Sequence, residues 1–108
     1  MKVIFHILDQ TKWQTNLDNI RDLLSYDSNA QIEVIVGAEA AQIFTAYSGL
    51  DFGDLLDSPK VHFSISKMAM DNYKMEPDLL PNGIVIEDLL IAKTVRLQNE
   101  EGYAYIRL

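Results

Sequence analysis

The chain contains no cysteine among its 108 residues. Disulfide bonds, thiolate nucleophiles and thiolate metal ligands are therefore excluded for this chain. Basic side chains are also few, because nine Lys and Arg stand against sixteen Asp and Glu, which gives a formal net charge of -7. Since this charge repels phosphate backbones and anionic headgroups, we expect neither nucleic acid nor a membrane surface as a partner.

Long apolar runs and glycine-rich motifs are missing as well. No apolar run approaches the roughly 20 residues that a membrane helix needs. Met1 and Lys2 lead into a strand-like segment without a signal-peptide cleavage site, which predicts a cytoplasmic chain. Gly37 stands alone after a strand-like run, so the sequence predicts no phosphate-binding loop, and we expect no cofactor.

The sequence does have a hydrophobic content of 48%, which predicts a single domain over residues 1–108. Apolar, β-branched runs predict strands at 3–8, 32–36, 61–65, 84–86 and 103–108. Four helices are predicted between them. The first runs from about Thr11, a possible N-cap, to 25–29, and the second bears Ile43, Phe44 and Tyr47. The third covers 67–74 and is capped by Ser66, and the fourth covers 87–99. The acidic stretch 51–59 is predicted to be a surface excursion with a short helical turn.

This alternation of strands and helices predicts an α/β fold, a three-layer α/β/α sandwich with a mostly parallel sheet of about five strands. The first strand is apolar on both faces and is expected in the sheet interior. Ligands of such sheets bind beyond the carboxyl ends of the strands. The candidate ligand-binding residues at those ends are Asp9, Gly37, Ser66 and Lys67.

Several segments carry a resemblance to a known family. They are the opening Val-Ile-Phe-His-Ile at 3–7, the Asn-Ile pair at 19–20, the strand-like run and glycine at 32–37, and the ending Glu-Gly-Tyr-Ala-Tyr-Ile-Arg at 101–107. In these segments the chain resembles the DsrE/DsrF-like proteins over nearly its whole length. The resemblance implies the fold described above and a homo-oligomer, either a dimer or a trimer.

The resemblance stops at the residue on which the family's sulfur chemistry depends. Sulfur-carrying members have a cysteine just after the third strand, and here Ser66 occupies that position, with Met68 and Ala69 where the family has Asn and Thr. A serine hydroxyl cannot hold a persulfide. We therefore expect a non-catalytic member, or one that binds a small anionic ligand near Ser66 and Lys67. The alternative is an accessory subunit of a sulfur-relay complex that relies on a partner's cysteine.

Other chemistries find little support in the sequence. Ser66 lacks a Gly-x-Ser-x-Gly elbow, and the two histidines, His6 and His62, lie inside strand-like runs. An enzyme that uses Ser66 stays open as a third hypothesis, but no catalytic residue is assigned. His6 and Asp9 do not have the spacing of a metal site on a strand, so no metal is expected.

Two further groups of side chains have an open interpretation. Met68, Met70, Tyr73 and Met75 are candidates for the contact surface of an oligomer, because methionine and tyrosine are enriched in interface cores. Alternation along the last strand places Tyr103 and Tyr105 on one face of the sheet. Packing between subunits and stacking on a ligand both explain these two phenols.

Overall fold

The computed structural model describes residues 1–45 and 48–108 as a five-stranded sheet flanked by helices. All strand pairs are parallel, and the strand order is β4-β3-β2-β1-β5. The strands are β1 (Lys2–Ile7), β2 (Gln31–Val36), β3 (Val61–Ser66), β4 (Val85–Glu87) and β5 (Ala104–Ile106). The α-helices are α1 (Trp13–Tyr26), α2 (Gly53–Leu56), α3 (Lys67–Asn72) and α4 (Leu90–Glu101), with 3-10 turns at Gln10–Lys12, Ala38–Phe44 and Pro77–Leu79.

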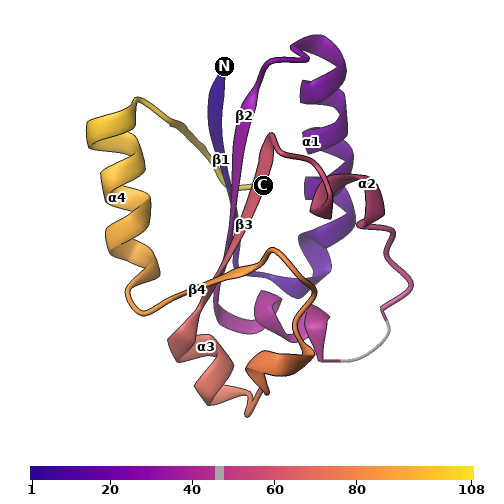
Figure 1. Ribbon diagram of the computed structural model, residues 1–108, viewed down its shortest axis with the longest axis vertical. Coiled ribbons are helices and arrows are strands. Elements are labelled where there is room, and N and C mark those ends of the chain that lie inside the picture. The colour runs from indigo at the N-terminus through magenta and orange to yellow at the C-terminus, as the bar shows by residue number, and fades with distance from the viewer. Residues whose placement is uncertain (46–47) are drawn as a thin grey trace.

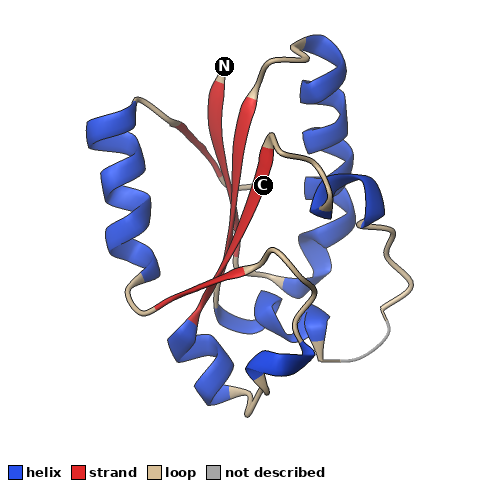
Figure 2. Ribbon diagram, viewed as in Figure 1, coloured by secondary structure: helices blue, strands red, loops and turns tan. Residues whose placement is uncertain are grey.

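The predicted three-layer α/β/α arrangement is confirmed. Figure 1 looks nearly along the plane of the sheet, with α4 alone on one side and α1 and α2 on the other. The same layers are plain when helices and strands are coloured by type (Figure 2). As predicted, β1 lies inside the sheet, where Val3 pairs with Ile32 of β2 and with Ala104 of β5.

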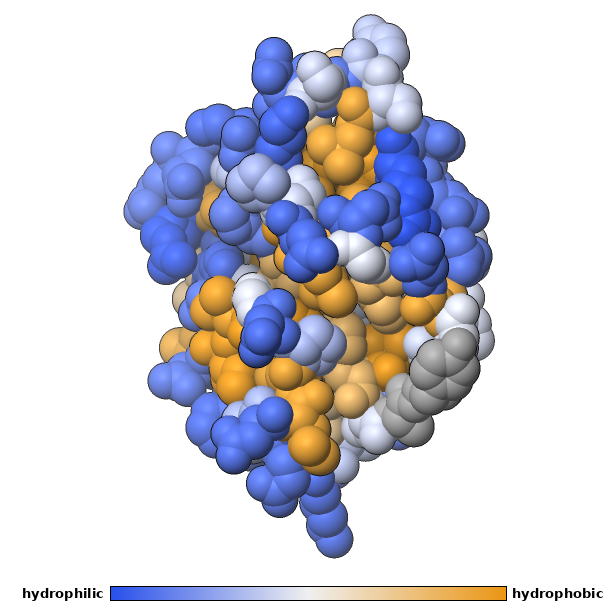
Figure 3. Space-filling view, turned by 45° about the vertical axis from the view of Figure 1, so that its right-hand side comes forward, coloured by the Kyte–Doolittle hydropathy of each residue, from blue (hydrophilic) through white to orange (hydrophobic). Residues whose placement is uncertain are grey.

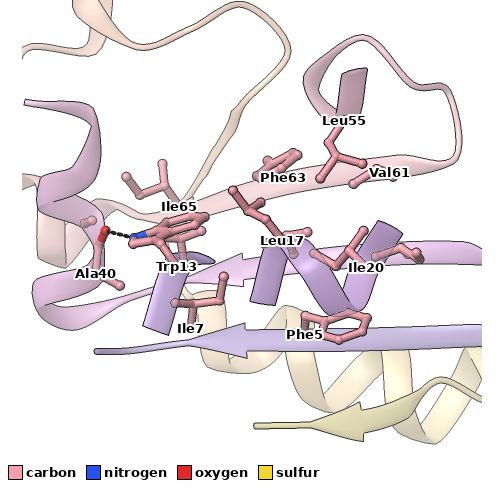
Figure 4. Packing of buried hydrophobic residues seen from close by; sticks show 14 of the residues in the cluster. Phe5, Ile7, Trp13, Leu17, Ile20, Ala40, Leu55, Val61, Phe63 and Ile65 are labelled. Carbon is pink, nitrogen blue, oxygen red and sulfur yellow. Dashed lines mark hydrogen bonds between the residues drawn. The ribbon is translucent and has the colours of Figure 1, made fainter. Parts of the chain in front are cut away.

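The main core lies on the sheet face that α1 covers. Residues at alternate positions of β1, β2 and β3 point to this face, as the period of two in a strand requires. Trp13 of α1 is 1% exposed, and its Nε1 donates a hydrogen bond to the carbonyl oxygen of Ala40 at 3.0 Å (Figure 4). Its ring meets Phe52 edge-on at 5.4 Å between centroids, so the segment before α2 is packed onto the core.

Several predicted details are wrong at their boundaries. Thr11 is not the cap of the first helix. Asp9 caps the 3-10 turn that precedes α1, by accepting a hydrogen bond from the Thr11 backbone N–H at 2.8 Å. The predicted helix after β2 is a 3-10 turn over Ala38–Phe44, and Tyr47 lies outside the described residues. Ala40 donates its N–H to the carbonyl of Leu8 and accepts from Trp13, so these tertiary bonds compete with the α-helical ladder.

The proposed oligomer contact at the methionines also needs correction. Met70 is 2% exposed and belongs to the core of the single chain, so it cannot lie at the centre of a subunit contact. The short helix α3 turns Met70 inward and leaves Met68 67% exposed. A sequence of alternating methionines does not reveal which one faces the core until the orientation of α3 is known.

The face beneath α4 has a smaller core and more open surface. Ile4, Ile35, Leu90 and Leu97 form its buried cluster, against which Tyr103 packs. No helix in the described part of the chain is long and apolar enough to cross a membrane. Figure 3 brings the side of α1 and α2 forward instead, and there apolar surface gathers mainly in the lower half of the molecule, towards the carboxyl ends of the strands.

Candidate functional site

A pocket of about 420 Å³ opens at the carboxyl end of the sheet, between the sheet and α4. Strands β1, β3 and β5 contribute side chains to its floor, and the loop after β2 contributes Gly37 and Ala38. One stripe of α4 forms its wall. The lining residues are His6, Leu8, Gly37, Ala38, Ser66, Leu90, Ile91, Thr94, Val95, Gln98 and Tyr105. None of these carries a lysine, arginine or carboxylate side chain.

His6 and Tyr105 form the polar pair of the pocket floor. His6 points to the α4 face of β1, and its Nδ1 lies 2.5 Å from the hydroxyl oxygen of Tyr105 on the adjacent strand β5. The two rings meet edge-on at 5.5 Å between centroids. Burial lowers the pKa of His6, and the nearby Arg107 guanidinium lowers it further, so the imidazole is neutral at neutral pH.

Ser66 is the N-cap of α3, as the sequence predicted. Its Oγ accepts a hydrogen bond from the backbone N–H of Ala69 at 3.2 Å. Ser66 is half-buried and lines the pocket together with Gly37. A Cβ on Gly37 would lie 3.2 Å from a side-chain carbon of Leu8, so glycine allows the loop to approach the pocket wall closely.

Lys67 and Asp9, the other two predicted site residues, do not line this pocket. The ammonium of Lys67 is 3.1 Å from a carboxylate oxygen of Asp71, one turn along the exposed side of α3. Asp9 lines a separate pocket of about 240 Å³, together with Lys12 and Arg107. Hydrogen bonds from the side chain and backbone of Thr11 lower the pKa of Asp9. The structure therefore brings two of the four predicted residues together.

A second polar group lies under α4, nearer to β3 and β4. The Nζ of Lys93 donates to the Ser64 hydroxyl at 2.5 Å and is 3.5 Å from Glu87. Glu33 on β2 is 8% exposed, and its Oε2 has no hydrogen-bond partner within the described residues. Burial raises the pKa of Glu33, and the attraction of Lys93 and His62 offsets only part of this effect.

Sequence reasoning missed the contribution of α4 to the site. Leu90, Thr94 and Gln98 follow a spacing of four, which is the signal of one helix face, but nothing in that spacing says that the face borders a pocket. The sequence places His6 inside a strand-like run, and it leaves Tyr105 with two interpretations, packing between subunits or stacking on a ligand. Both lie in the segments that carry the resemblance to DsrE/DsrF-like proteins, and that resemblance was the available signal.

Comparisons with known proteins find a likeness among solved structures. No family model matches the chain, and no curated protein matches it significantly. Among solved structures, the chain is similar to MTH1491, a protein of unknown function from Methanobacterium thermoautotrophicum. The two are 25% identical, the match covers 99% of this chain and 98% of the other, and the TM-score is 0.85. This likeness supports the fold and assigns no activity, because the similar protein is itself of unknown function.

Proposed function

We propose that the chain is a thiol-free DsrE/DsrF-like protein that binds a small molecule in the pocket beneath α4 and does not itself carry sulfur. The observation that carries this proposal is the position of the pocket. It lies at the carboxyl ends of parallel strands, where ligands of such sheets bind, and Ser66 lines it at the position where the resemblance places the cysteine.

The contacts of Ser66 support a binding role over a catalytic one. Its Oγ already accepts a backbone hydrogen bond from Ala69, and the histidine that shares its pocket is engaged with Tyr105. A serine nucleophile needs a base that takes its proton. The pocket is therefore suited to binding a ligand, and its Ser66 and His6 do not form the nucleophile–base pair that acyl transfer needs.

The ligand was expected to be anionic because of Lys67 and the start of α3. Lys67 is paired with Asp71 and stands outside the pocket, so the ammonium that motivated this expectation does not face the ligand. The anionic ligand expected from the sequence is therefore not part of this proposal. The uncharged lining favours a ligand without charge, since a carboxylate would lose its hydration without gaining a cation.

We also propose that the protein acts as a homo-oligomer, a dimer or a trimer, and that it acts in the cytoplasm. The support for association is the exposed apolar surface of residues that also line the pocket. Ile91 is 75% exposed and Val95 is 48% exposed, both on α4, and Tyr105 is 40% exposed on β5. The same surface suits the alternative function, in which a partner brings its own cysteine to the pocket. A persulfide-transfer assay with the candidate partner distinguishes that alternative.

A matched pair of substitutions tests the binding proposal. Val95→Trp places an indole at the pocket wall, whereas Val85→Trp changes a valine of equal exposure outside the pocket, since Val85 is 50% exposed on β4. Small metabolites are screened by ligand-detected NMR. We expect compounds that bind the unmodified chain and the Val85→Trp variant, and that do not bind the Val95→Trp variant. Equal binding to both variants, or no binding at all, contradicts the proposal.

A further inference from the structure

The polar atoms of the pocket differ in what they can still offer to a ligand. The hydroxyl of Thr94 donates to the carbonyl of Leu90 at 2.9 Å, and Ser66 accepts from Ala69 at 3.2 Å. These bonds are internal to α4 and to the start of α3. Ser66 keeps its O–H as a possible donor, and the side-chain amide of Gln98 adds two N–H donors at another part of the lining. His6 and Tyr105, by contrast, bond to each other from neighbouring strands and both line the pocket.

A neutral histidine bonded to a tyrosine always retains one spare donor. If the Tyr105 hydroxyl donates to Nδ1 of His6, the imidazole proton lies on Nε2 and that N–H is free to donate. If Nδ1 carries the proton and donates to the hydroxyl oxygen, the O–H of Tyr105 is free instead. In both tautomers the pair offers a ligand one N–H or O–H without a charge.

The rest of the lining selects against a charged ligand. Leu8, Leu90, Ile91 and Val95 surround the pair with apolar surface. His6 stays neutral for the reasons given above, and no lysine or arginine lines the pocket within the described chain. A carboxylate that entered would give up its hydration for hydrogen bonds from neutral donors alone, because no cationic side chain among the described residues lines the pocket. An uncharged carbonyl loses less hydration and can accept the same hydrogen bonds.

We infer that the pocket selects an uncharged, mostly apolar molecule bearing a carbonyl acceptor, such as a ketone, an ester or an amide, and that the His6–Tyr105 pair donates the hydrogen bond that anchors it. This inference rests on the proposed binding function and adds the chemical class of the ligand. The volume of about 420 Å³ admits a compact ring or short chain.

The test compares two probes of matched shape, cyclohexyl methyl ketone and cyclohexanecarboxylate, by NMR titration at pH 7.5. We expect the ketone to bind the unmodified chain at least about tenfold more tightly, because the desolvation cost of the carboxylate is not recovered. The Val95→Trp variant should bind neither probe. This comparison of probes does not depend on whether a variant of the pair folds.

The role of the pair is tested with a double variant. His6→Phe with Tyr105→Phe removes the spare donor whichever tautomer is present, and should weaken ketone binding about three- to tenfold. The matched control makes the same two changes elsewhere, His62→Phe with Tyr73→Phe, at an exposed histidine and at a tyrosine of similar exposure, 38% against 40%. The control should bind the ketone as the unmodified chain does.

The outcomes separate this inference from the proposed function. Equal or tighter binding of the carboxylate, lost in Val95→Trp, overturns the inference and leaves the binding function standing. A preference for the ketone that survives in the double variant overturns the anchoring role of the pair. If neither probe binds and the metabolite screen finds no ligand, the proposed function fails, and this inference fails with it.

Discussion

At the scale of single residues, Ser66 is the N-cap of α3 and also the residue on which the proposed DsrE/DsrF-like relationship depends. Its side chain caps α3 from the position where the resembling proteins have a thiol, and the cap itself needs only an acceptor. The scaffold can therefore keep its local structure while the sulfur chemistry is absent. The capping role was predictable from the sequence, since serine before a helical segment is a common N-cap.

Two substitutions at this residue are predicted to act differently. Ser66→Ala should lower the free energy of unfolding by about 1 kcal/mol, because the N–H of Ala69 loses its partner. Ser25→Ala, on the exposed side of α1, is the control and should change it by less than about 0.5 kcal/mol. Urea denaturation measures both. A loss at Ser66 no larger than at Ser25 contradicts the capping role.

Ser66→Cys is expected to yield a thiol with a lowered pKa. The N–H groups at the start of α3 favour the thiolate, so the pKa should fall below the ordinary value of about 8.5. The rate of alkylation as a function of pH measures it. A thiol that titrates at the ordinary value or above it would show that this junction does not stabilise negative charge.

At the scale of elements, α4 covers its face of the sheet over a buried carboxyl group. Glu33 has a raised pKa because burial outweighs the attraction of Lys93 and His62, so its ionised form is disfavoured in the folded state. Because the pKa of Glu33 is raised on folding, its contribution to the free energy of unfolding is fully present below the pKa of about 4.5 that it has in the unfolded chain. That contribution is lost as the pH rises through the pKa of the folded state. The packing of α4 is therefore expected to be weaker at neutral pH than in mild acid.

Replacing Glu33 by glutamine tests this pH dependence. Glu33→Gln keeps the size of the side chain and removes its charge, so the variant should be more stable than the unmodified chain at pH 7. The difference in the free energy of unfolding should shrink towards zero as the pH falls to about 4.5. A difference that is constant with pH would mean that the pKa of Glu33 is not raised on folding, and a variant less stable at pH 7 would mean that the attraction of Lys93 outweighs burial.

The elements also show where sequence reasoning succeeds. Strong local signals succeed: the apolar run at 3–8 predicts the strand found as β1, and the helix predicted from about Thr11 to 25–29 is found as α1. The sequence predicts an α-helix after β2, but Ala38–Phe44 forms a 3-10 turn. Its hydrogen bonds to Leu8 and Trp13 are tertiary, so the local sequence pattern could not reveal them. Such bonds link residues far apart in the chain, and no local pattern contains them.

At the scale of the whole molecule, the candidate site combines residues from both ends of the sequence. Gly37 and Ser66 were predictable, because both follow strands whose carboxyl ends share one edge of a parallel sheet. The pairing of His6 with Tyr105 depends on β5 lying next to β1, and strand order is set by packing of the whole chain. The wall formed by α4 depends on the same packing.

Association of the whole molecule is the remaining prediction. Light scattering at micromolar concentration should give a mass of two or three chains, because the apolar residues on α4 are better buried than exposed. Ile91→Asp with Val95→Asp should reduce the mass to one chain, since charge at the centre of a contact is costly. Tyr26→Asp, 76% exposed at the end of α1, should leave it unchanged. A mass near 12.3 kDa for the unmodified chain refutes association.

The position of β5 has a consequence for the dynamics of the fold. This strand is an edge strand held to β1 over three register pairs, whereas β1 and β2 are paired over six. Short edge strands open locally at a lower free energy than central strands, and amide hydrogen exchange reports such openings. When β5 opens, Tyr105 moves away from His6, and the pocket loses one of its lining residues and the hydrogen bond between the two. A bound ligand would stabilise the paired state of β5. Amide hydrogen exchange in β5 should therefore be slower with the ligand than without it, while exchange in the central strands stays the same.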